Sequence, residues 1–405
     1  MRGDGTDRSM ARRAVLATLG VGLTTGCLQL QDPDEGGTAD PSTERVTAGS
    51  TPGSTTRQTS TATSESSPAA RTPLEPQAPG NIRWRYETRT AVAERPVVAD
   101  RTVYVTTKDD RVLALATDTG AERWTYETKM ESENLRHAVA GDRLFVAGSF
   151  ATEAVGRGNG RLSWGTASGA KYKPLVRDGV AYLGSSTGAR TLRAFDVAAD
   201  ELLWSFTTGG SVRGRPALVG GTLFVSAGAH DGEETAPMYA LDAETGDLQW
   251  KRTFDGTLSS SVVPFEGLLY VTGENGTIAA VDPADGSVVW QRTIDGVGGA
   301  AGAPDPQFAH GRLYLPDRSL RALDPTTGET LWAYTERSWF NRLAIVDGAV
   351  YATRYDGGTI HVFDPATGDE RATFETPLQE PTGLTVGPET VVCGDRAGAV
   401  AAIWR

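Results

Sequence analysis

The chain has 405 residues, which is enough for two or three ordinary domains or for one large repeat array. It carries 51 Asp and Glu against 39 Lys and Arg, and a formal charge of -12 excludes the positive surface expected of a nucleic-acid-binding protein. Two cysteines and four scattered histidines exclude a disulfide scaffold, a Cys-rich zinc site and an iron–sulfur protein. The basic residues are 34 Arg and 5 Lys, and this acidic, Lys-poor composition favours a halophilic, haloarchaeal-type source.

Residues 1–26 have the pattern of an export signal. The pair Arg12-Arg13 precedes an uncharged run over 14–26, which is about half the length of a membrane span. The run ends in Thr24-Thr25-Gly26-Cys27, where small residues precede a cysteine as in a lipoprotein signal. This pattern predicts twin-arginine export and lipidation of Cys27, with anchoring at the cell surface on the outer face of the cytoplasmic membrane. The alternative is a short N-terminal membrane helix with an incidental cysteine.

Residues 27–79 have the composition of a disordered stalk. They contain no aromatic residue and are rich in Ser, Thr, Pro, Gly and acidic residues. Such a stretch cannot bury enough apolar surface to offset the entropy lost on ordering. Dense Ser and Thr with Pro also suits O-glycosylation.

Residues 80–405 are one repeat array. Tryptophans recur at intervals of 40 to 46 residues, a period typical of propellers and solenoids, and Ala372 stands where the next one would fall. A phrase with an aspartate, and in its best copies a glycine four residues later, precedes the tryptophan. Asp can accept hydrogen bonds from backbone amides across a turn and Gly supplies a positive φ, so the phrase predicts a hairpin. The tryptophans are Trp84, Trp124, Trp164, Trp204, Trp250, Trp290 and Trp332, and the aspartates are Asp196, Asp242, Asp282, Asp324 and Asp364.

Short apolar segments between these phrases, such as 268–272 and 277–281, alternate like strands, and no helical period occurs. The array therefore predicts an all-β, eight-bladed β-propeller of four-stranded antiparallel blades. The last blade, 384–404, contains three strands, so we expect the N-terminal strand at 82–86 to complete it and close the ring. Ala116 and Gly156 replace the turn aspartate in the first two blades, which predicts looser turns there.

The repeated phrase resembles the PQQ-like propeller repeats of quinoprotein dehydrogenases and of bacterial outer-membrane assembly lipoproteins. In the dehydrogenases, the resemblance implies a quinone held between a Trp and a Cys-Cys disulfide, with calcium on Glu, Asn and Asp. This sequence has no such pair, because its one propeller cysteine, Cys393, lies alone in an apolar strand. No nucleophile elbow, zinc helix or phosphate loop is present either. We therefore expect no catalytic or metal-binding residue and no cofactor, with PQQ and calcium as the alternative.

Basic residues gather where each Trp strand connects to the next inner strand. These connections are expected to surround one mouth of a central channel, and positive charge there would suit an acidic ligand. Trp339 adds a candidate aromatic contact. The alternative is that the basic side chains pair with neighbouring carboxylates. The candidates are Arg95, Arg136, His137, Lys171, Lys173, Arg213, Arg215, Trp339 and Arg342.

Asn275-Gly276-Thr277 is a glycosylation sequon, although Asn-Gly is also a favoured hairpin turn. Together these features predict a monomeric, lipid-anchored propeller that binds an envelope protein or an acidic ligand without catalysis. A quinone-dependent enzyme or electron-transfer lipoprotein and an extracellular small-molecule sensor are the rival hypotheses. Because fold alone does not determine function, the sequence leaves these rivals open.

Overall fold

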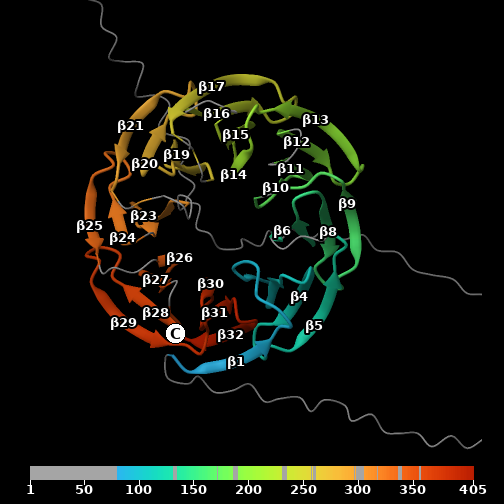
Figure 1. The fold of residues 1–405 in the computed structure, drawn as a ribbon, viewed down its shortest axis with the longest axis vertical. Helices are drawn as coiled ribbons and strands as arrows, with labels where there is room; N and C mark the ends of the chain where they lie inside the picture. The colour runs from blue at the N-terminus through green and yellow to red at the C-terminus, as the bar shows by residue number, and fades with distance from the viewer. Residues whose placement is uncertain are drawn as a thin grey trace, which may run out of the picture. The chain divides into compact units, whose positions relative to one another are not determined.

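The computed structural model describes residues 80–405 except 131–134, 171, 186–189, 230–234, 257, 259–260, 296, 298–304, 317, 336–339 and 355–356. It confirms the predicted all-β propeller, because eight four-stranded antiparallel sheets form a closed ring (Figure 1). Within the described residues, no helix has the length and apolar character that a membrane span requires. The predictions for residues 1–79, including Cys27, and for Lys171 and Trp339 lie outside the described residues, as does the side chain of Arg342.

Each of the first seven blades is formed by four consecutive strands. The first strand of each blade lies nearest the axis and the fourth lies at the outside of the ring (Figure 1). Blades one to four contain β2 (Val97–Ala99), β3 (Thr102–Thr106), β4 (Arg111–Ala116) and β5 (Glu122–Glu127); β6 (Arg136–Ala140), β7 (Arg143–Ala147), β8 (Thr152–Gly156) and β9 (Leu162–Thr166); β10 (Leu175–Arg177), β11 (Val180–Gly184), β12 (Thr191–Asp196) and β13 (Glu201–Thr207); and β14 (Val212–Val219), β15 (Thr222–Ala227), β16 (Thr235–Asp242) and β17 (Leu248–Asp255). Blades five to seven contain β18 (Val263–Phe265), β19 (Leu268–Thr272), β20 (Thr277–Val281) and β21 (Val288–Thr293); β22 (Gln307–Ala309), β23 (Arg312–Pro316), β24 (Leu320–Leu323) and β25 (Thr330–Tyr334); and β26 (Phe340–Val346), β27 (Ala349–Arg354), β28 (Thr359–Phe363) and β29 (Glu370–Glu375).

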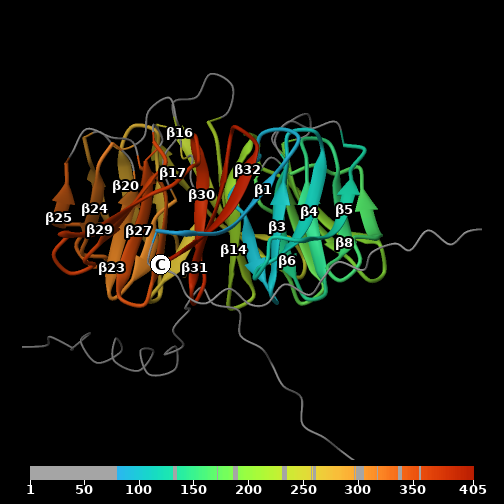
Figure 2. The ribbon, with the colours of Figure 1, turned by 90° about the horizontal axis from the view of Figure 1, so that it is seen from below.

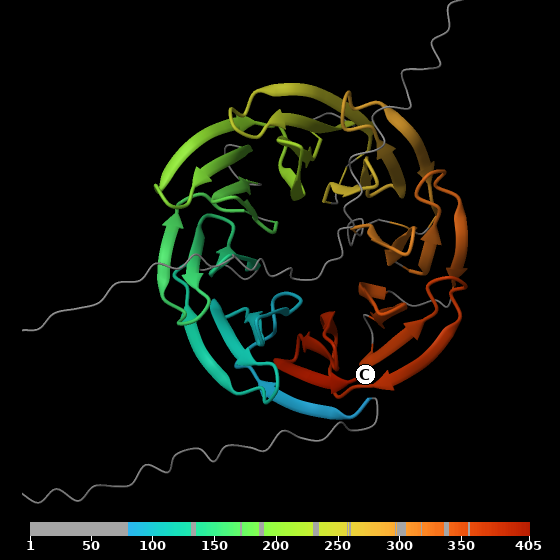
Figure 3. The ribbon, with the colours of Figure 1, turned by 180° about the vertical axis from the view of Figure 1, so that it is seen from behind.

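The eighth blade joins the two ends of the described chain. It contains β30 (Pro381–Val386), β31 (Thr390–Asp395), β32 (Ala399–Trp404) and, as its outermost strand, β1 (Ile82–Glu87). The blue β1 lies next to the red β32 in both the edge-on view and the view from behind (Figures 2 and 3). The backbone N–H of Gly80 also donates to the carbonyl of Trp404 at 2.7 Å. The predicted closure of the ring by the N-terminal strand is therefore confirmed.

The hydrophobic core lies between blades rather than inside them. At every interface around the ring, a cluster of buried side chains joins two neighbouring blades. The middle strands, such as β4 and β20, are buried at every residue because a blade covers each of their faces. Such strands read as continuous apolar runs, and their burial supplies the main stabilising free energy of the fold.

The repeated tryptophans attach each blade to the next. In six cases the indole Nε1 donates to a backbone carbonyl in the outer turn of the following blade, at 2.8–3.1 Å. The glycine of that turn lies against the indole, so a Cβ there would come within 2.5–2.8 Å of a ring carbon. The pairs are Trp84 with Gly120, Trp124 with Gly160, Trp204 with Gly246, Trp250 with Gly286, Trp290 with Gly328 and Trp332 with Gly368. The repeat period therefore reflects one interaction that recurs around the ring.

Two positions depart from this pattern. Asp200, with φ of 57°, stands where the third blade would have its turn glycine, and Nε1 of the preceding Trp164 has no hydrogen-bond partner among the described residues. Ala372 precedes the eighth blade, in which β32 and β1 come from opposite ends of the chain and no outer turn connects them. A tryptophan at this position would have no turn to pack against.

The turn aspartates bond as the sequence predicts, but the turns without aspartate are no looser. Oδ1 of Asp242 accepts hydrogen bonds from the backbone N–H groups of Glu244 and Thr245 at 2.9 and 3.0 Å, and Asp196, Asp282, Asp324 and Asp364 accept in the same way. The N–H of the turn glycine donates to the carbonyl of Ala116 and of Gly156 at 2.8 Å, and to that of Asp242 at 2.9 Å. The expectation of looser turns is therefore wrong, because this backbone bond closes the turn whichever residue begins it.

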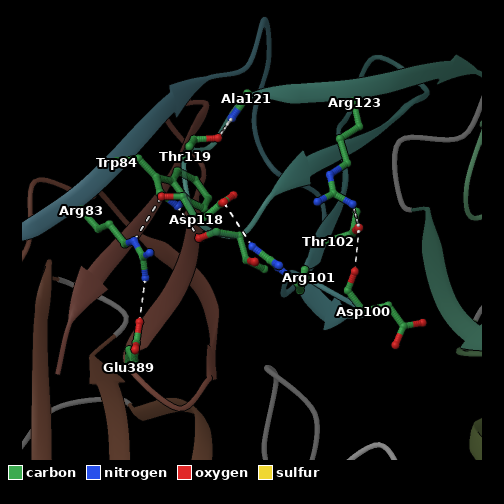
Figure 4. A network of polar contacts seen from close by, with 11 residues as sticks. Arg83, Trp84, Asp100, Arg101, Thr102, Asp118, Thr119, Ala121, Arg123 and Glu389 are labelled. Atoms are coloured by element: carbon green, nitrogen blue, oxygen red, sulfur yellow. Dashed lines mark hydrogen bonds and ion pairs between the residues drawn. The ribbon is translucent and has the colours of Figure 1, made fainter. Parts of the chain in front are cut away.

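Polar contacts reinforce the interface between the eighth and first blades. From β1, Trp84 donates to the carbonyl of Thr117 at 2.8 Å and Arg83 donates through Nε to that of Asp118 at 3.1 Å (Figure 4). The same Arg83 forms an ion pair with Glu389 of the eighth blade at 3.1 Å. The strand that closes the ring therefore connects the rest of the eighth blade to the first blade.

Candidate functional site around the propeller axis

The inner strands surround the axis, and neighbouring inner strands from β2 to β18 contact one another in order (Figure 1). Because a connection leads into each inner strand, the predicted basic residues lie in or just before these strands. Arg136 and His137 begin β6, Lys173 precedes β10, and Arg213 and Arg215 lie in β14. These candidates therefore lie at or near the start of the inner strands, on separate blades.

A buried carboxylate connects the first three blades. Glu94, 4% exposed, precedes β2, and its Oε2 accepts a hydrogen bond from the backbone N–H of His137 at 3.3 Å. Its other oxygen forms an ion pair with Nζ of Lys173 at 3.2 Å. His137 is fully buried, with Nδ1 at 3.2 Å from Oγ1 of Thr106. His137 is thus an internal residue of this cluster and not an exposed group at a channel mouth.

Charges of both signs surround His137. Burial lowers its pKa to about 4; the charge of Glu94 acts in the opposite direction, and Lys173, Arg95 and Arg136 lower the pKa further. The imidazole is therefore neutral at pH 7, and its Nε2 has no hydrogen-bond partner among the described residues. One buried imidazole therefore lies among three cations and the carboxylate of Glu94, which pairs with one of them, Lys173.

A second cluster of polar contacts connects the fourth, fifth and sixth blades. Nη1 of Arg213 lies 3.5 Å from Oε1 of Glu274. The backbone N–H of Arg215 donates to Oγ of Ser261 at 2.9 Å, and the N–H of Ser261 donates to Oδ1 of Asp305 at 2.7 Å. The alternative expected from the sequence, pairing with neighbouring carboxylates, therefore holds for Lys173 and Arg213.

Arg177 is a basic residue near the axis that sequence reasoning missed. It ends β10. Loss of hydration lowers the pKa of Arg215, and the charge of Arg177 lowers that pKa further. Arg177 follows an ordinary apolar strand, Leu175–Arg177, and no motif distinguishes it from other strand-end arginines. Its effect on Arg215 arises only in the folded ring.

Asn275 lies at the turn between β19 and β20 and is exposed. Its Oδ1 accepts from the backbone N–H of Thr277 at 3.1 Å, and its Nδ2 donates to the carbonyl of Asp255 at 3.4 Å. These two hydrogen bonds explain the Asn-Gly pair as part of a hairpin turn. Glycosylation at Asn275 stays a prediction.

The described residues do not fit the quinone and calcium site that the resemblance implies. Cys393 is the single cysteine of the propeller, and it is fully buried with Sγ 3.2 Å from the carbonyl of Gly383. Burial raises the pKa of its thiol to about 12, so it is an unreactive core residue. Among the described residues, no group of three His, Cys, Asp or Glu side chains is arranged to hold a metal ion.

Eight closed blades joined by repeated tryptophan contacts are the architecture of a PQQ-like propeller. The sequence profile of the family described as "Outer membrane protein assembly factor BamB" matches residues 74–173 and 188–405. The chain belongs to this family.

Individual relatives differ in function while sharing the fold. The chain is 29% identical over 163 residues to the dehydrogenase subunit of the quinone alcohol dehydrogenase of Acetobacter aceti; the match covers 38% of this chain and 19% of that protein, so the chain spans about a fifth of that relative. BamB from Moraxella catarrhalis is 16% identical with a TM-score of 0.63, covering 79% of this chain and 98% of that one. Quinohemoprotein alcohol dehydrogenase from Comamonas testosteroni is 15% identical with a TM-score of 0.66, covering 80% and 76%. The computationally designed Ika8 protein is 16% identical with a TM-score of 0.67, covering 80% and 100%.

Proposed function

We propose that this protein is a lipid-anchored propeller on the outer face of the cytoplasmic membrane, where it acts as a non-catalytic scaffold that binds a protein partner. This proposal rests on the buried polar groups near the axis, which bind to one another across blades. The carboxylate of Glu94 is held by Lys173 and by the backbone of His137, so it connects three blades and is not available as a general acid or base. Groups used in this way stabilise a rigid ring.

Family membership supports the scaffold role, because the matching family is described as an assembly factor. The sequence pattern from Arg12-Arg13 to Cys27 supports the membrane anchor. The acidic, Lys-poor composition supports a halophilic, haloarchaeal-type source. We expect no role in outer-membrane barrel assembly, since a cell of that type would have no outer membrane to serve.

A quinone-dependent dehydrogenase is the second candidate. The observation that favours it is the similarity to the quinone alcohol dehydrogenase subunit of Acetobacter aceti. The absence of a Cys-Cys pair from the sequence argues against it.

The first experiment measures cofactor binding. The mature protein in high salt is mixed with PQQ and calcium, and its melting temperature and bound-cofactor absorbance are recorded beside those of a known quinoprotein dehydrogenase. We expect no change in melting temperature and no retained absorbance. Stoichiometric retention of PQQ with stabilisation would refute the non-catalytic proposal, because a ligand that binds the folded state raises its stability.

The second experiment tests the anchor. The Cys27→Ala variant is expected to appear in the medium instead of the membrane fraction, whereas Cys393→Ala, which changes the buried cysteine, is expected to stay with the membrane. Equal membrane retention of both variants would contradict lipid anchoring at Cys27.

A further inference from the structure

The outer strand of the third blade is a sheet edge without charged residues. β13 is the last strand of its sheet and lies at the outside of the ring (Figure 1). Edge strands can pair with another chain, and proteins often prevent this with charged side chains along the edge. Among the described outer strands of six or more residues, β13 alone has no charged residue after its first position. The others contain Arg83, Arg123, Lys251, Arg292 and Arg371.

A bulge in β13 leaves two adjacent leucines exposed. Phe195 pairs with Leu202 and Ala194 pairs with Trp204, so Leu203 is the additional residue of the bulge. Bulges change the direction of side chains. Leu202 is 53% exposed and Leu203 is 47% exposed, and no other described strand has two exposed large apolar residues. A contact that covered both side chains would remove apolar surface from water, which is favourable.

The rest of β13 is regular, with exposed and inward-facing side chains in alternation. Leu203, Ser205 and Thr207 are exposed, whereas Trp204 is buried and Phe206 is half-buried. Residues opposite each other in an antiparallel pair lie on the same face of the sheet. A two-fold axis at Ser205 meets this condition for two copies of β13, because it sets Leu203 opposite Thr207. It also sets Trp204 opposite Phe206, so no charged residue faces another.

The same pairing on β17, the other outer strand of more than six residues, is opposed by charge. Lys251 stands one residue after the tryptophan of β17, as Ser205 does in β13. A two-fold axis there would set Lys251 opposite the same lysine of a second copy, and like charges directly opposite each other destabilise a sheet. Because the chain has a formal charge of -12, two copies approach each other most easily along an uncharged edge.

We propose that β13 pairs with β13 of a second copy about a two-fold axis at Ser205, so that the two third blades form one eight-stranded antiparallel sheet. The outer backbone groups of each strand bond to those of the other strand, and the contact covers Leu202 and Leu203. Such a contact is closed by its two-fold axis, so assembly stops at the dimer. The dimer does not depend on the proposed function, and it differs from the monomer that the sequence predicts.

The association state of the purified protein tests this proposal. The parent carries Cys27→Ala, so that no lipid brings copies together. Sedimentation velocity is recorded over a series of protein concentrations, at the lowest salt concentration at which circular dichroism shows a folded chain. We expect a monomer–dimer equilibrium. Ser205→Lys and Ser205→Glu are each expected to weaken it by at least about tenfold, because each variant sets two like charges opposite each other at the axis.

Mixing the two variants separates a specific pairing from a loss of folding. An equimolar mixture of Ser205→Lys and Ser205→Glu is expected to form dimers again, since opposite charges then face each other across the axis. The matched control is Gln291→Lys, which adds the same charge at the exposed residue after the tryptophan of β21. This variant is expected to dimerise as the parent does.

Four outcomes would overturn the proposal. A parent that stays monomeric at every concentration would leave the β13 edge to a different polypeptide or to solvent. Equal dimerisation by Ser205→Lys and the parent, or an equal loss of dimer in Gln291→Lys, would place the contact elsewhere. A mixture that does not dimerise, although both variants are folded by circular dichroism, would exclude pairing about Ser205.

Discussion

Replacing the turn glycine Gly328 by alanine is expected to destabilise the propeller far more than the same change at Gly348. Both glycines have positive φ, 71° and 67°. An L-residue in the left-handed region costs about 1–2 kcal/mol, and this cost applies to both variants. A Cβ at Gly348 meets nothing within 4 Å, whereas a Cβ at Gly328 would lie 2.6 Å from carbons of the Trp290 indole. Only Gly328→Ala therefore forces a buried ring to move.

The additional cost follows from the contacts of Trp290, which is 7% exposed. Displacing a packed ring costs about 1–3 kcal/mol. Weakening its 2.8 Å hydrogen bond to the carbonyl of Pro325 costs about 1 kcal/mol more. We expect Gly328→Ala to lower the free energy of unfolding by about 3–6 kcal/mol and Gly348→Ala by about 1–2 kcal/mol.

Urea unfolding in high salt, followed by tryptophan fluorescence and circular dichroism, measures the difference between the two variants. Urea is uncharged, so the salt concentration can be held constant through the titration. Losses that agree within about 0.5 kcal/mol would refute the reasoning, because the indole contact would then contribute nothing.

Three further predictions concern the indoles and the buried histidine. Trp204→Phe is expected to cost about 1 kcal/mol more than Trp164→Phe, since the indole of Trp204 donates to the carbonyl of Ala243 at 3.0 Å and that of Trp164 has no partner among the described residues; urea titrations would contradict this if the costs were equal. Ala372→Trp is expected not to raise the melting temperature, and a clear increase would show that a docking turn exists in the eighth blade. The pKa of His137 is lowered from 6.5 to about 4, so the unfolded state binds the proton first. The contribution of neutral His137 to the free energy of unfolding is fully present above pH 6.5, and it falls by up to roughly 3 kcal/mol as the pH drops to 4. The variant His137→Asn is expected to lose this decrease between pH 6.5 and 4 when urea unfolding is measured as a function of pH.

The repeats made the fold predictable because one local interaction occurs in almost every blade. An indole, a turn glycine and a turn aspartate at fixed spacing predict a strand, a hairpin and the next blade together. The exceptions also have physical causes. Ala372 replaces a tryptophan because the eighth blade, closed by the N-terminal strand, has no outer turn for an indole to contact. The turn at Ala116 has no aspartate, but it keeps the hydrogen bond from the N–H of Gly120 to the carbonyl of Ala116.

The candidate site was predictable only in part, because its pairings cross between blades. The sequence indicates basic inner connections, but it does not show that Lys173 pairs with Glu94 or that His137 is fully buried. It also gives no signal for Arg177, whose charge acts on Arg215. Such interactions are set by the angle between blades and by the bulge in β14, which no periodic pattern encodes.

The position of β1 has a mechanical consequence. β1 is the strand that closes the ring, and it directly follows residues 27–79, through which the proposed anchor would pull. A force along β1 loads every backbone pair from Ile82 opposite Ile403 to Glu87 opposite Ala399 at the same time. A force directed away from the ring would separate these pairs one after another. If the proposed anchor and partner pull on this strand, the direction of the force would decide whether the ring resists the load or opens at its seam.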